Sequence, residues 1–407
     1  MKPQLAINGG DPVRSAPWPK WPQYGAEEEA ATLRVVRSSN AHPMFGPETE
    51  RFEKVFAAYH GGGFAVAVGS GTAALQLSLA AAGVGCGHEV ICPSYTYVAS
   101  ASAAVEQNAV PVFVDSEPLS QGADPREIAK KITPATKAIV LVHVNGYPCD
   151  IDPVIELARE HGIAVIEDCS HAHGATHRGR KVGTIGDFGA FSIQQKKNLS
   201  AGTGGVVFTH CEKTAEHMRD LRTFHWNKVG HNWLINEFSS AIAACQLKKL
   251  DVMNAARRRH AQIIVDGLRG IEGITPLPGL PDTEPSFYNL ILQYDESVIG
   301  LPRSEFIKAL AAEGIPINMF YQPLQRWPIF AEADFYGRGS PFSDPMQANG
   351  APDYGSVSTP LAEAICDRIN LEIKVQPTCF EQDMHDVVTA ISKVLQHRAE
   401  LSTPVCS

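Results

Sequence analysis

Short apolar runs, rich in β-branched residues, alternate with segments of helical character through the first half of the chain. A strand buried on both faces has this continuous apolar character, and an amphipathic helix separates one such strand from the next. The alternation therefore predicts βαβ units and a mostly parallel sheet covered by helices. Sheets of this kind bind ligands at the carboxyl ends of their strands. The runs lie at residues 64–68, 89–93, 110–115, 137–143, 163–168 and 188–193.

The chain has 407 residues, which is too long for one small domain, and three parts are expected. Residues 1–25 are rich in proline and glycine and predict an extended N-terminal arm. Residues 26–265 carry the alternating pattern and predict a large α/β domain that ends in a long helix. Residues 266–407 contain a strand-like run and two helical segments, and they predict a smaller C-terminal α+β domain.

The composition excludes several classes of partner. The net charge of −9 argues against a nucleic-acid surface, which needs a basic patch. No apolar stretch has the length of a membrane span, and the N-terminus lacks the apolar region of a signal peptide. The nine cysteines are dispersed without a CxxC pair, which is typical of reduced thiols. We therefore expect a cytoplasmic protein that acts on small molecules, without nucleic acid or membrane as a partner.

The stretch "VAVGSGTAAL" (66–75) joins a strand to a helix through glycines. Free backbone N–H groups at a helix N-terminus bind anions, and hydroxyl groups of Ser70 and Thr72 add donors beside Gly71. The stretch is thus a candidate phosphate site. The alternative is a plain turn in which serine or threonine caps the helix.

The stretch "IAVIEDCSHAHGA" places Glu167 and Asp168 at the end of a buried strand, where a functional carboxylate belongs in an open α/β sheet. The alternative is that Asp168 caps the next segment. Cys169, His171 and His173 follow and resemble a metal site, but their spacing fits no standard zinc pattern. We therefore expect no metal.

The stretch "FSIQQKKNLSAGTGG" (191–205) carries two adjacent lysines, Lys196 and Lys197. A lysine desolvated by apolar surroundings has a lowered pKa, and its free amine can form a Schiff base. Two ordinary surface charges are the alternative. The apolar flanks predict that at least one of the two lysines points inward.

A phosphate cradle, a buried carboxylate and a desolvated lysine together are what pyridoxal 5'-phosphate needs. The carboxylate keeps the pyridine nitrogen protonated, so that the ring can act as an electron sink.

Ordered blocks along nearly the whole chain resemble the sugar aminotransferases of the DegT/DnrJ/StrS group. The resemblance implies the type I fold of pyridoxal-phosphate-dependent transferases, with a mostly parallel seven-stranded sheet in the large domain. The blocks include "FGPETERFEKVFAAYHG", "VGSGTAALQLSLAAAGVGCGHEVICPSYTYVASASA", "VIEDCSHAHGA", "VGTIGDFGAFSI" and "INEFSSAIAACQLKKLD".

The resemblance also implies a role for each motif residue. The family places the catalytic lysine five positions after a serine, so that Ser192 selects Lys197 as the Schiff-base lysine and proton carrier. Ser192 itself is expected to contact the phosphate. Asp168 matches the partner of the pyridine nitrogen. Tyr97 matches the aromatic residue that stacks on the ring, with Tyr95 as the less favoured choice.

Further matches concern the edge of the site. Gly71 and Thr72, with Ser70 beside them, match the phosphate cradle, and His171 lies where the family has glutamine or histidine near the cofactor hydroxyl. Asn232 matches an asparagine that reaches the phosphate of the neighbouring subunit, which implies a homodimer with shared active sites.

The resemblance predicts a transaminase. Sugar 3-dehydratases of this fold carry histidine in place of the lysine, so Lys197 favours amino transfer. The chain departs from the family pattern at Thr203, Leu234 and Gln325, which we interpret as substrate-side positions and as signs of an acceptor other than a typical nucleotide sugar.

The N-terminal stretch and the "QQ" before the lysines are closest to the cyclitol branch. We therefore expect an amino acid, glutamine or glutamate, to donate its amino group to a keto-cyclitol or keto-sugar. The alternatives are a dehydratase or lyase such as an aminohydroxybenzoate synthase, and a pyridoxal-phosphate-binding regulator without turnover.

Overall fold

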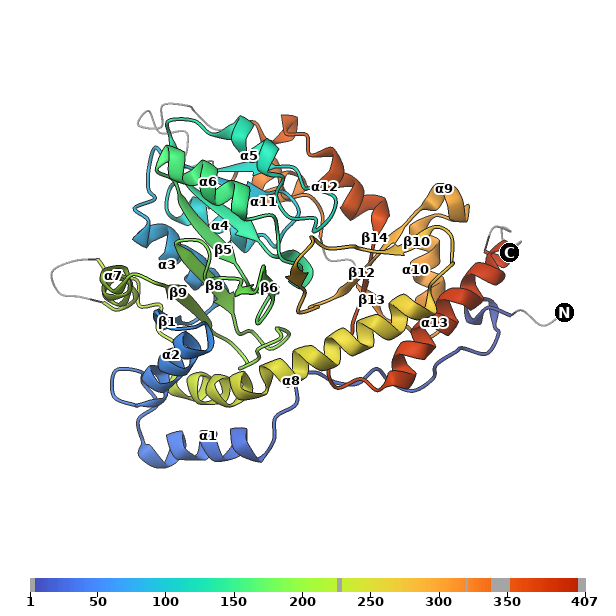
Figure 1. Cartoon of the computed structure of the whole chain (residues 1–407), viewed down its shortest axis with the longest axis horizontal. Helices are drawn as coiled ribbons and strands as arrows, with labels where there is room; N and C mark the ends of the chain where they lie inside the picture. The colour runs from blue at the N-terminus through green and yellow to red at the C-terminus, as the bar shows by residue number, and fades with distance from the viewer. Residues whose placement is uncertain (1–3, 225–228, 319–320, 338–351, 402–407) are drawn as a thin grey trace.

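The computed structural model describes residues 4–224, 229–318, 321–337 and 352–401 of the chain. A central sheet is flanked by helices, and a long helix, α8 (Glu237–Gly267), extends from beneath it toward a second, smaller sheet (Figure 1). The α/β class that the alternating pattern predicts is confirmed.

The central sheet has seven strands in the order β1-β9-β8-β5-β4-β2-β3. Neighbouring strands from β8 to β3 are parallel, whereas β9 runs antiparallel to both of its neighbours. The mostly parallel seven-stranded sheet is thus confirmed. The strands are β1 (Phe64–Val68), β2 (Glu89–Pro93), β3 (Val110–Val114), β4 (Thr136–Val142), β5 (Ala164–Asp168), β8 (Phe188–Ser192) and β9 (Gly205–Thr209).

Six of these strands begin and end within one residue of the apolar runs that predicted them. The pattern did not predict β9. A parallel neighbour needs a crossover connection, usually a helix, whereas a short return loop joins antiparallel strands. Only residues 193–204 connect β8 to β9, and they form such a loop. This loop contains both lysines.

Side chains alternate between the two faces of the sheet. On β1, Val66 and Val68 pack into the cluster under α3, α4 and α7, while Ala65 and Ala67 face α2 and α8. The helices around the sheet are α1 (Ala26–Ser38), α2 (Glu48–Tyr59), α3 (Gly71–Ala81), α4 (Ala99–Glu106), α5 (Pro125–Lys131), α6 (Asp152–His161) and α7 (Glu212–Arg222).

A second sheet, entirely antiparallel, has the strand order β10-β12-β14-β13. The helix α8 contacts α1 and α2 near its start and α13 near its end, and thereby connects the two halves of the molecule. The elements of this half are β10 (Ile274–Pro276), β12 (Leu290–Tyr294), α9 (Glu296–Ile299), α10 (Arg303–Ala312), β13 (Ile317–Asn318), β14 (Asn370–Ile373) and α13 (Glu381–Gln396).

Part of the region after residue 265 packs on the large sheet instead. Leu324, Phe330 and Tyr354 are buried in the same cluster as the strands β2 and β4, together with α11 (Pro328–Ala331) and α12 (Pro360–Ala364). The described residues after 265 therefore divide between two cores. A third, small sheet joins β11 (Thr283–Glu284) to β6 (Thr176–His177) and β7 (Arg180–Lys181).

The N-terminal arm connects both halves. Leu5 is buried in the core of the smaller half, and Arg14 forms ion pairs with Asp383 and Asp386. Farther along, the indole N–H of Trp21 donates to the carbonyl of Lys197 at 3.1 Å. Within the described ranges, no helix is long and apolar enough to cross a membrane.

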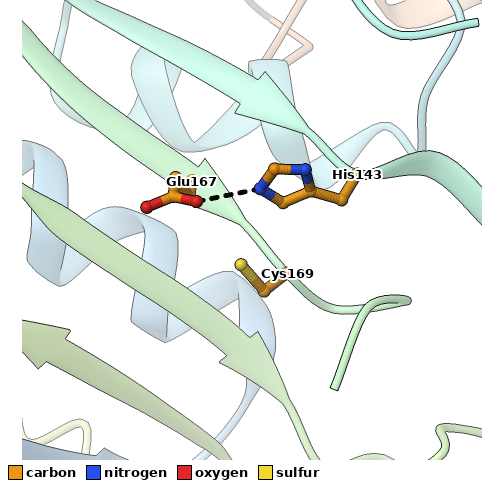
Figure 2. A group of neighbouring side chains, drawn as sticks. All are labelled: His143, Glu167 and Cys169. Carbon is orange, nitrogen blue, oxygen red and sulfur yellow. Dashed lines mark hydrogen bonds and ion pairs between the residues drawn. The ribbon is translucent and has the colours of Figure 1, made fainter. Parts of the chain in front are cut away.

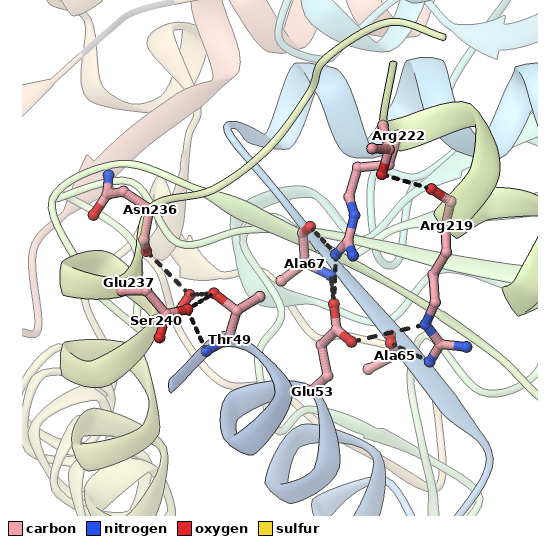
Figure 3. Close-up of polar contacts among 10 residues, drawn as sticks. Thr49, Glu53, Ala65, Ala67, Arg219, Arg222, Asn236, Glu237 and Ser240 are labelled. Carbon is pink, nitrogen blue, oxygen red and sulfur yellow. Dashed lines mark hydrogen bonds and ion pairs between the residues drawn. The ribbon is translucent and has the colours of Figure 1, made fainter. Parts of the chain in front are cut away.

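Buried carboxylates fix the helices around β1 (Figure 3). Glu237, which is fully buried in the first turn of α8, accepts hydrogen bonds from the backbone N–H groups of Glu48 and Thr49 and from the Thr49 hydroxyl. It thus satisfies donors at the start of α2 that the helix itself leaves free. Glu53 accepts from the backbone N–H of Ala67 and from Arg222, which ties β1 to α2 and α7.

Replacing Glu237 with alanine should destabilise the fold by roughly 2–4 kcal/mol, because it leaves the buried backbone N–H groups of Glu48 and Thr49 without an acceptor. Denaturant unfolding midpoints of Glu237→Ala and wild type measure this loss. The exposed Glu216 on α7 provides the control, since Glu216→Ala removes the same groups from solvent-facing surface. Equal midpoints for Glu237→Ala and the control would contradict this role.

Candidate active site

Two sheet strands end side by side at the candidate site. Parallel strands β5 and β8 end at Asp168 and Ser192, so both side chains lie at the carboxyl edge of the sheet. The return loop after β8 then brings Lys197 back toward this edge. The N–H of Lys197 donates to the carbonyl of Gln194 at 2.8 Å, and the N–H of Ala201 donates to the carbonyl of Ile193 at 2.9 Å.

Asp168 is held in place from two sides. Its Oδ2 accepts a hydrogen bond from the hydroxyl of Ser100 on α4 at 2.9 Å, and its Oδ1 accepts from the backbone N–H of Ser170 at 3.0 Å. The Ser170 contact matches the capping alternative for this residue. Each carboxylate oxygen can accept more than one hydrogen bond, so the side chain keeps acceptor capacity for a ligand.

The two lysines have different environments. Lys196 is exposed, whereas Lys197 is partly buried. Burial lowers the pKa of Lys197 to about 8, although the nearby Asp168 carboxylate opposes this shift. Lys197 is therefore the inward lysine, and its amine is available as a nucleophile near neutral pH.

The cradle at the start of α3 is tightly packed against the ends of β8 and β9. Ser70 caps the helix by accepting from the N–H of Ala73, so the capping alternative is also correct for its hydroxyl. A Cβ on Gly71 would lie 2.5 Å from the Cβ of Ser192, and a Cβ on Gly205 would overlap the carbonyl oxygen of Ser70. Glycine here lets Ser192 and the first-turn N–H groups face the same point, as a phosphate site requires.

The structure separates the two candidate tyrosines. Tyr95 is buried, and its hydroxyl donates to Glu372 and accepts from Asn145 and Asn370. It is therefore committed to a buried network. Tyr97 has 57% of its surface exposed and remains available to cover a ring.

His171 is buried near Lys197. Its Nδ1 accepts a hydrogen bond from the N–H of Asn145 at 3.3 Å, and its ring stacks on that of Tyr288 with 4.1 Å between centroids. Burial, Lys197 and Lys374 hold the pKa of His171 well below its ordinary value. The imidazole is thus neutral with its proton on Nε2, which makes Nε2–H a hydrogen-bond donor.

Cys169, His171 and His173 do not form a metal-binding group among the described residues; instead, His143, Glu167 and Cys169 lie together (Figure 2). Nδ1 of His143 accepts from the N–H of Cys149, so that Nε2 carries the proton donated to Glu167 at 3.0 Å. Glu167 also accepts from three backbone N–H groups, those of Gly183, Ile185 and Gly186. These groups are already paired, and we interpret the cluster as a structural anchor of the 183–186 turn.

Two of the remaining sequence-predicted positions, Thr203 and Leu234, lie beside Gly69 next to the cradle. Asn232 is exposed and has a left-handed backbone (φ 53°). The Thr203 hydroxyl donates to the carbonyl of Gly69 at 3.3 Å, and a Cβ on Gly69 would lie 3.2 Å from the carbonyl of Leu234. Gln325, in contrast, is buried. Its side-chain oxygen accepts a hydrogen bond from the Ser94 hydroxyl, and its side-chain nitrogen donates one to the Thr359 hydroxyl.

The structure also adds residues that the motifs did not identify. Ser100 supports Asp168, as described above. Tyr288 and Lys374 lie about 90 and 180 residues beyond Lys197 in sequence, yet Nζ of Lys197 is 5.0 Å and Nζ of Lys374 is 4.3 Å from the Tyr288 ring centroid. No local pattern in the sequence marks either residue.

The fold and these residues fit pyridoxal 5'-phosphate: an anion cradle, a buried carboxylate and a desolvated lysine meet at one sheet edge. The molecule is a transferase of the type I pyridoxal-phosphate fold. The chain belongs to the DegT/DnrJ/EryC1/StrS aminotransferase family, whose model matches residues 23–351, and it is an aminotransferase.

Relatives match over almost the full length. The L-glutamine:2-deoxy-scyllo-inosose aminotransferase of Streptoalloteichus tenebrarius is 38% identical over 98% of this chain and 100% of its own. An aminotransferase from Psychrobacter cryohalolentis has a TM-score of 0.84 and 30% identity, covering 95% of this chain and 100% of its own. The structure of 3-amino-5-hydroxybenzoic acid synthase has a TM-score of 0.82 and 29% identity, with the same coverage.

Gly71→Ala should weaken binding of pyridoxal phosphate by at least about tenfold, because the new methyl group pushes Ser192 away from the cradle. A fluorescence titration of the cofactor into the apoprotein measures the dissociation constant. Gly85→Ala is the matched control, since a Cβ there meets nothing within 4 Å. An unchanged constant in Gly71→Ala would show that the cradle lies elsewhere.

Lys197 should react as a free amine at lower pH than an exposed lysine. Its lowered pKa leaves the amine half unprotonated near about pH 8 and largely unprotonated one unit above. Pulse acetylation of the apoprotein across pH, read by peptide mass spectrometry, gives the midpoint at each lysine. A lysine with the ordinary side-chain pKa of about 10.4 should show a midpoint about two units higher. Coincident midpoints would contradict the desolvation of Lys197.

Proposed function

We propose that the protein transfers the amino group of L-glutamine to a keto-cyclitol of the scyllo-inosose class, in aminocyclitol antibiotic biosynthesis. The observation that carries this proposal is the match to the glutamine-dependent inosose aminotransferase, which extends over both chains almost completely. The site supports it, because the catalytic lysine and its partners occur in the order and geometry that amino transfer needs.

Each end of the cofactor has a residue to receive it. The first-turn N–H groups of Gly71 and Thr72, with the Ser192 hydroxyl, would bind the phosphate. The Asp168 carboxylate would keep a proton on the pyridine nitrogen, and Nε2–H of His171 would donate to the ring hydroxyl. Tyr97, whose side chain is largely open to solvent, would stack on the ring.

Bound pyridoxal phosphate supplies a carbonyl that captures amino groups and a protonated ring that accepts electron density from the reacting carbon. Lys197 anchors it and then acts as general base and acid. Its Nζ removes the proton from the α-carbon of the donor and returns a proton to the carbon of the acceptor. A pKa of about 8 suits both duties near neutral pH.

The same proposal includes a homodimer. Asn232 is the residue that would reach the phosphate site of the partner subunit. Its exposure and left-handed backbone support this role, as does the stack of His231 on Trp233 (3.9 Å between centroids), which stiffens the segment.

An assay of purified enzyme with pyridoxal phosphate, L-glutamine and 2-deoxy-scyllo-inosose tests the function. We expect an amino-cyclitol product by mass spectrometry, with glutamine preferred over glutamate and alanine. Lys197→Ala should lose at least about 10³-fold in rate, because the proton carrier is gone. Lys196→Ala, which changes the exposed neighbour, should remain within about threefold of wild type.

Two outcomes of this assay would contradict the proposal and indicate a different function. Loss of water without net amine exchange would indicate a dehydratase such as an aminohydroxybenzoate synthase. No turnover with a panel of amino acids and ketones, despite bound cofactor, would indicate a regulator.

A further inference from the structure

Lys374 is a second lysine of the site, and amino transfer as described above gives it no task. It follows directly after β14, in the smaller half of the molecule. Its Nζ lies 4.3 Å from the centroid of the Tyr288 ring, to which Nζ of Lys197 is also close, at 5.0 Å. Both ammonium groups therefore lie beside the same aromatic ring, and Lys374 is close enough to the catalytic lysine to feel its charge.

No carboxylate oxygen lies within ion-pair distance of Lys374 Nζ among the described residues. Glu372 is near in sequence, but its oxygens accept from Tyr95 and Asn289. Burial raises the pKa of Glu372 to about 7 and Lys374 opposes this rise, so the two side chains attract each other across a distance but form no direct ion pair. In the part of the chain that the structure describes, Lys374 therefore has no direct ion-pair partner.

Other cations increase the positive potential at this point. Arg257 is 2% exposed, stacks on Trp21 at 4.8 Å and hydrogen-bonds to Asn254, an uncharged residue. Burial lowers the pKa of Lys374 to about 8, Glu372 opposes the shift, and Lys197 and Arg257 add to it. Buried positive charge of this kind is stabilised by an anion that enters the site.

The two substrates of the proposed reaction differ in charge. The amino donor carries an α-carboxylate next to the amino group that reacts, whereas a keto-cyclitol carries hydroxyl groups and no charge. A cation close to Lys197 Nζ is placed to meet the donor carboxylate when the donor α-carbon is at the catalytic amine.

We propose that Lys374 binds the α-carboxylate of the amino donor and thereby orients the donor for reaction at Lys197. This assignment rests on the proposed function, because it needs an amino acid as donor. Lys374 is then a substrate-binding residue supplied by the strand β14. It sets the affinity for the donor and leaves the affinity for the uncharged acceptor unchanged.

Lys374→Met tests the assignment, because methionine keeps most of the length and removes the charge. We expect the KM for glutamine to rise at least about 30-fold, which is typical of losing one partner of a buried charge pair. The KM for the keto-cyclitol should stay within about threefold. Lys374→Arg should recover part of the donor affinity. Lys196→Met, which removes an exposed charge next to Lys197, is the control and should leave both constants within about threefold.

A truncated donor separates binding from a structural role. 4-Aminobutanamide is glutamine without the α-carboxylate, and wild type and Lys374→Met should turn it over equally slowly. If the variant loses as much activity on this amine as on glutamine, Lys374 is a structural residue and the assignment is wrong. An unchanged KM for glutamine in Lys374→Met would also show that the assignment is wrong.

Binding to the wild-type holoenzyme gives a readout that does not depend on turnover or on a variant that folds. By calorimetry, 4-carbamoylbutanoate, which has the carboxylate but lacks the amine, should bind at least about tenfold more tightly than the neutral pentanediamide. Equal affinities would overturn the assignment. If the wild type does not use glutamine at all, the proposed function fails, and the two ligands still report whether the site prefers a carboxylate.

Discussion

The site depends on the balance between burial and charge at one amine, Nζ of Lys197. Burial removes water from the ammonium group and favours the neutral amine, while the Asp168 carboxylate favours the charged form. Asp168 exerts this influence because β5 and β8 are parallel neighbours that end at the same edge. The sheet topology therefore determines the reactivity of the lysine, and the short return into β9 determines its position.

The smaller half of the molecule completes the site from the other side. The backbone N–H groups of Ser286 and Tyr288 donate to the carbonyls of Gly146 and Asn145, each at 3.0 Å, and Asn198 Nδ2 donates to the carbonyl of Ser286 at 3.0 Å. These bonds place the Tyr288 ring against His171. Residues far apart in the sequence thus enclose the catalytic amine, and the donor site that we propose lies on this second wall.

Much of this arrangement could be predicted from local sequence. The apolar runs located six strands. The resemblance to the family, through its serine–lysine spacing, distinguished Lys197 from Lys196, and the structure places Lys197 inward and Lys196 at the surface. The roles of Ser70 and Asp168 as caps could not be decided, because capping and ligand binding use the same residue types. Tyr288, Lys374 and the burial of Gln325 arise from contacts between distant segments, which no short pattern encodes. The true neighbours of Cys169 were missed for the same reason.

The central claim is that Lys197 is the amine that holds the cofactor. Borohydride reduction of the holoenzyme fixes the cofactor to the amine that carries it, and peptide mass spectrometry then identifies the lysine. We expect the mass of the reduced cofactor on the Lys197 side chain, with Lys196 and Lys374 unmodified. Fragmentation of the peptide that contains both Lys196 and Lys197 shows which of the two carries it. Modification of Lys196 or Lys374, with Lys197 free, would contradict this claim.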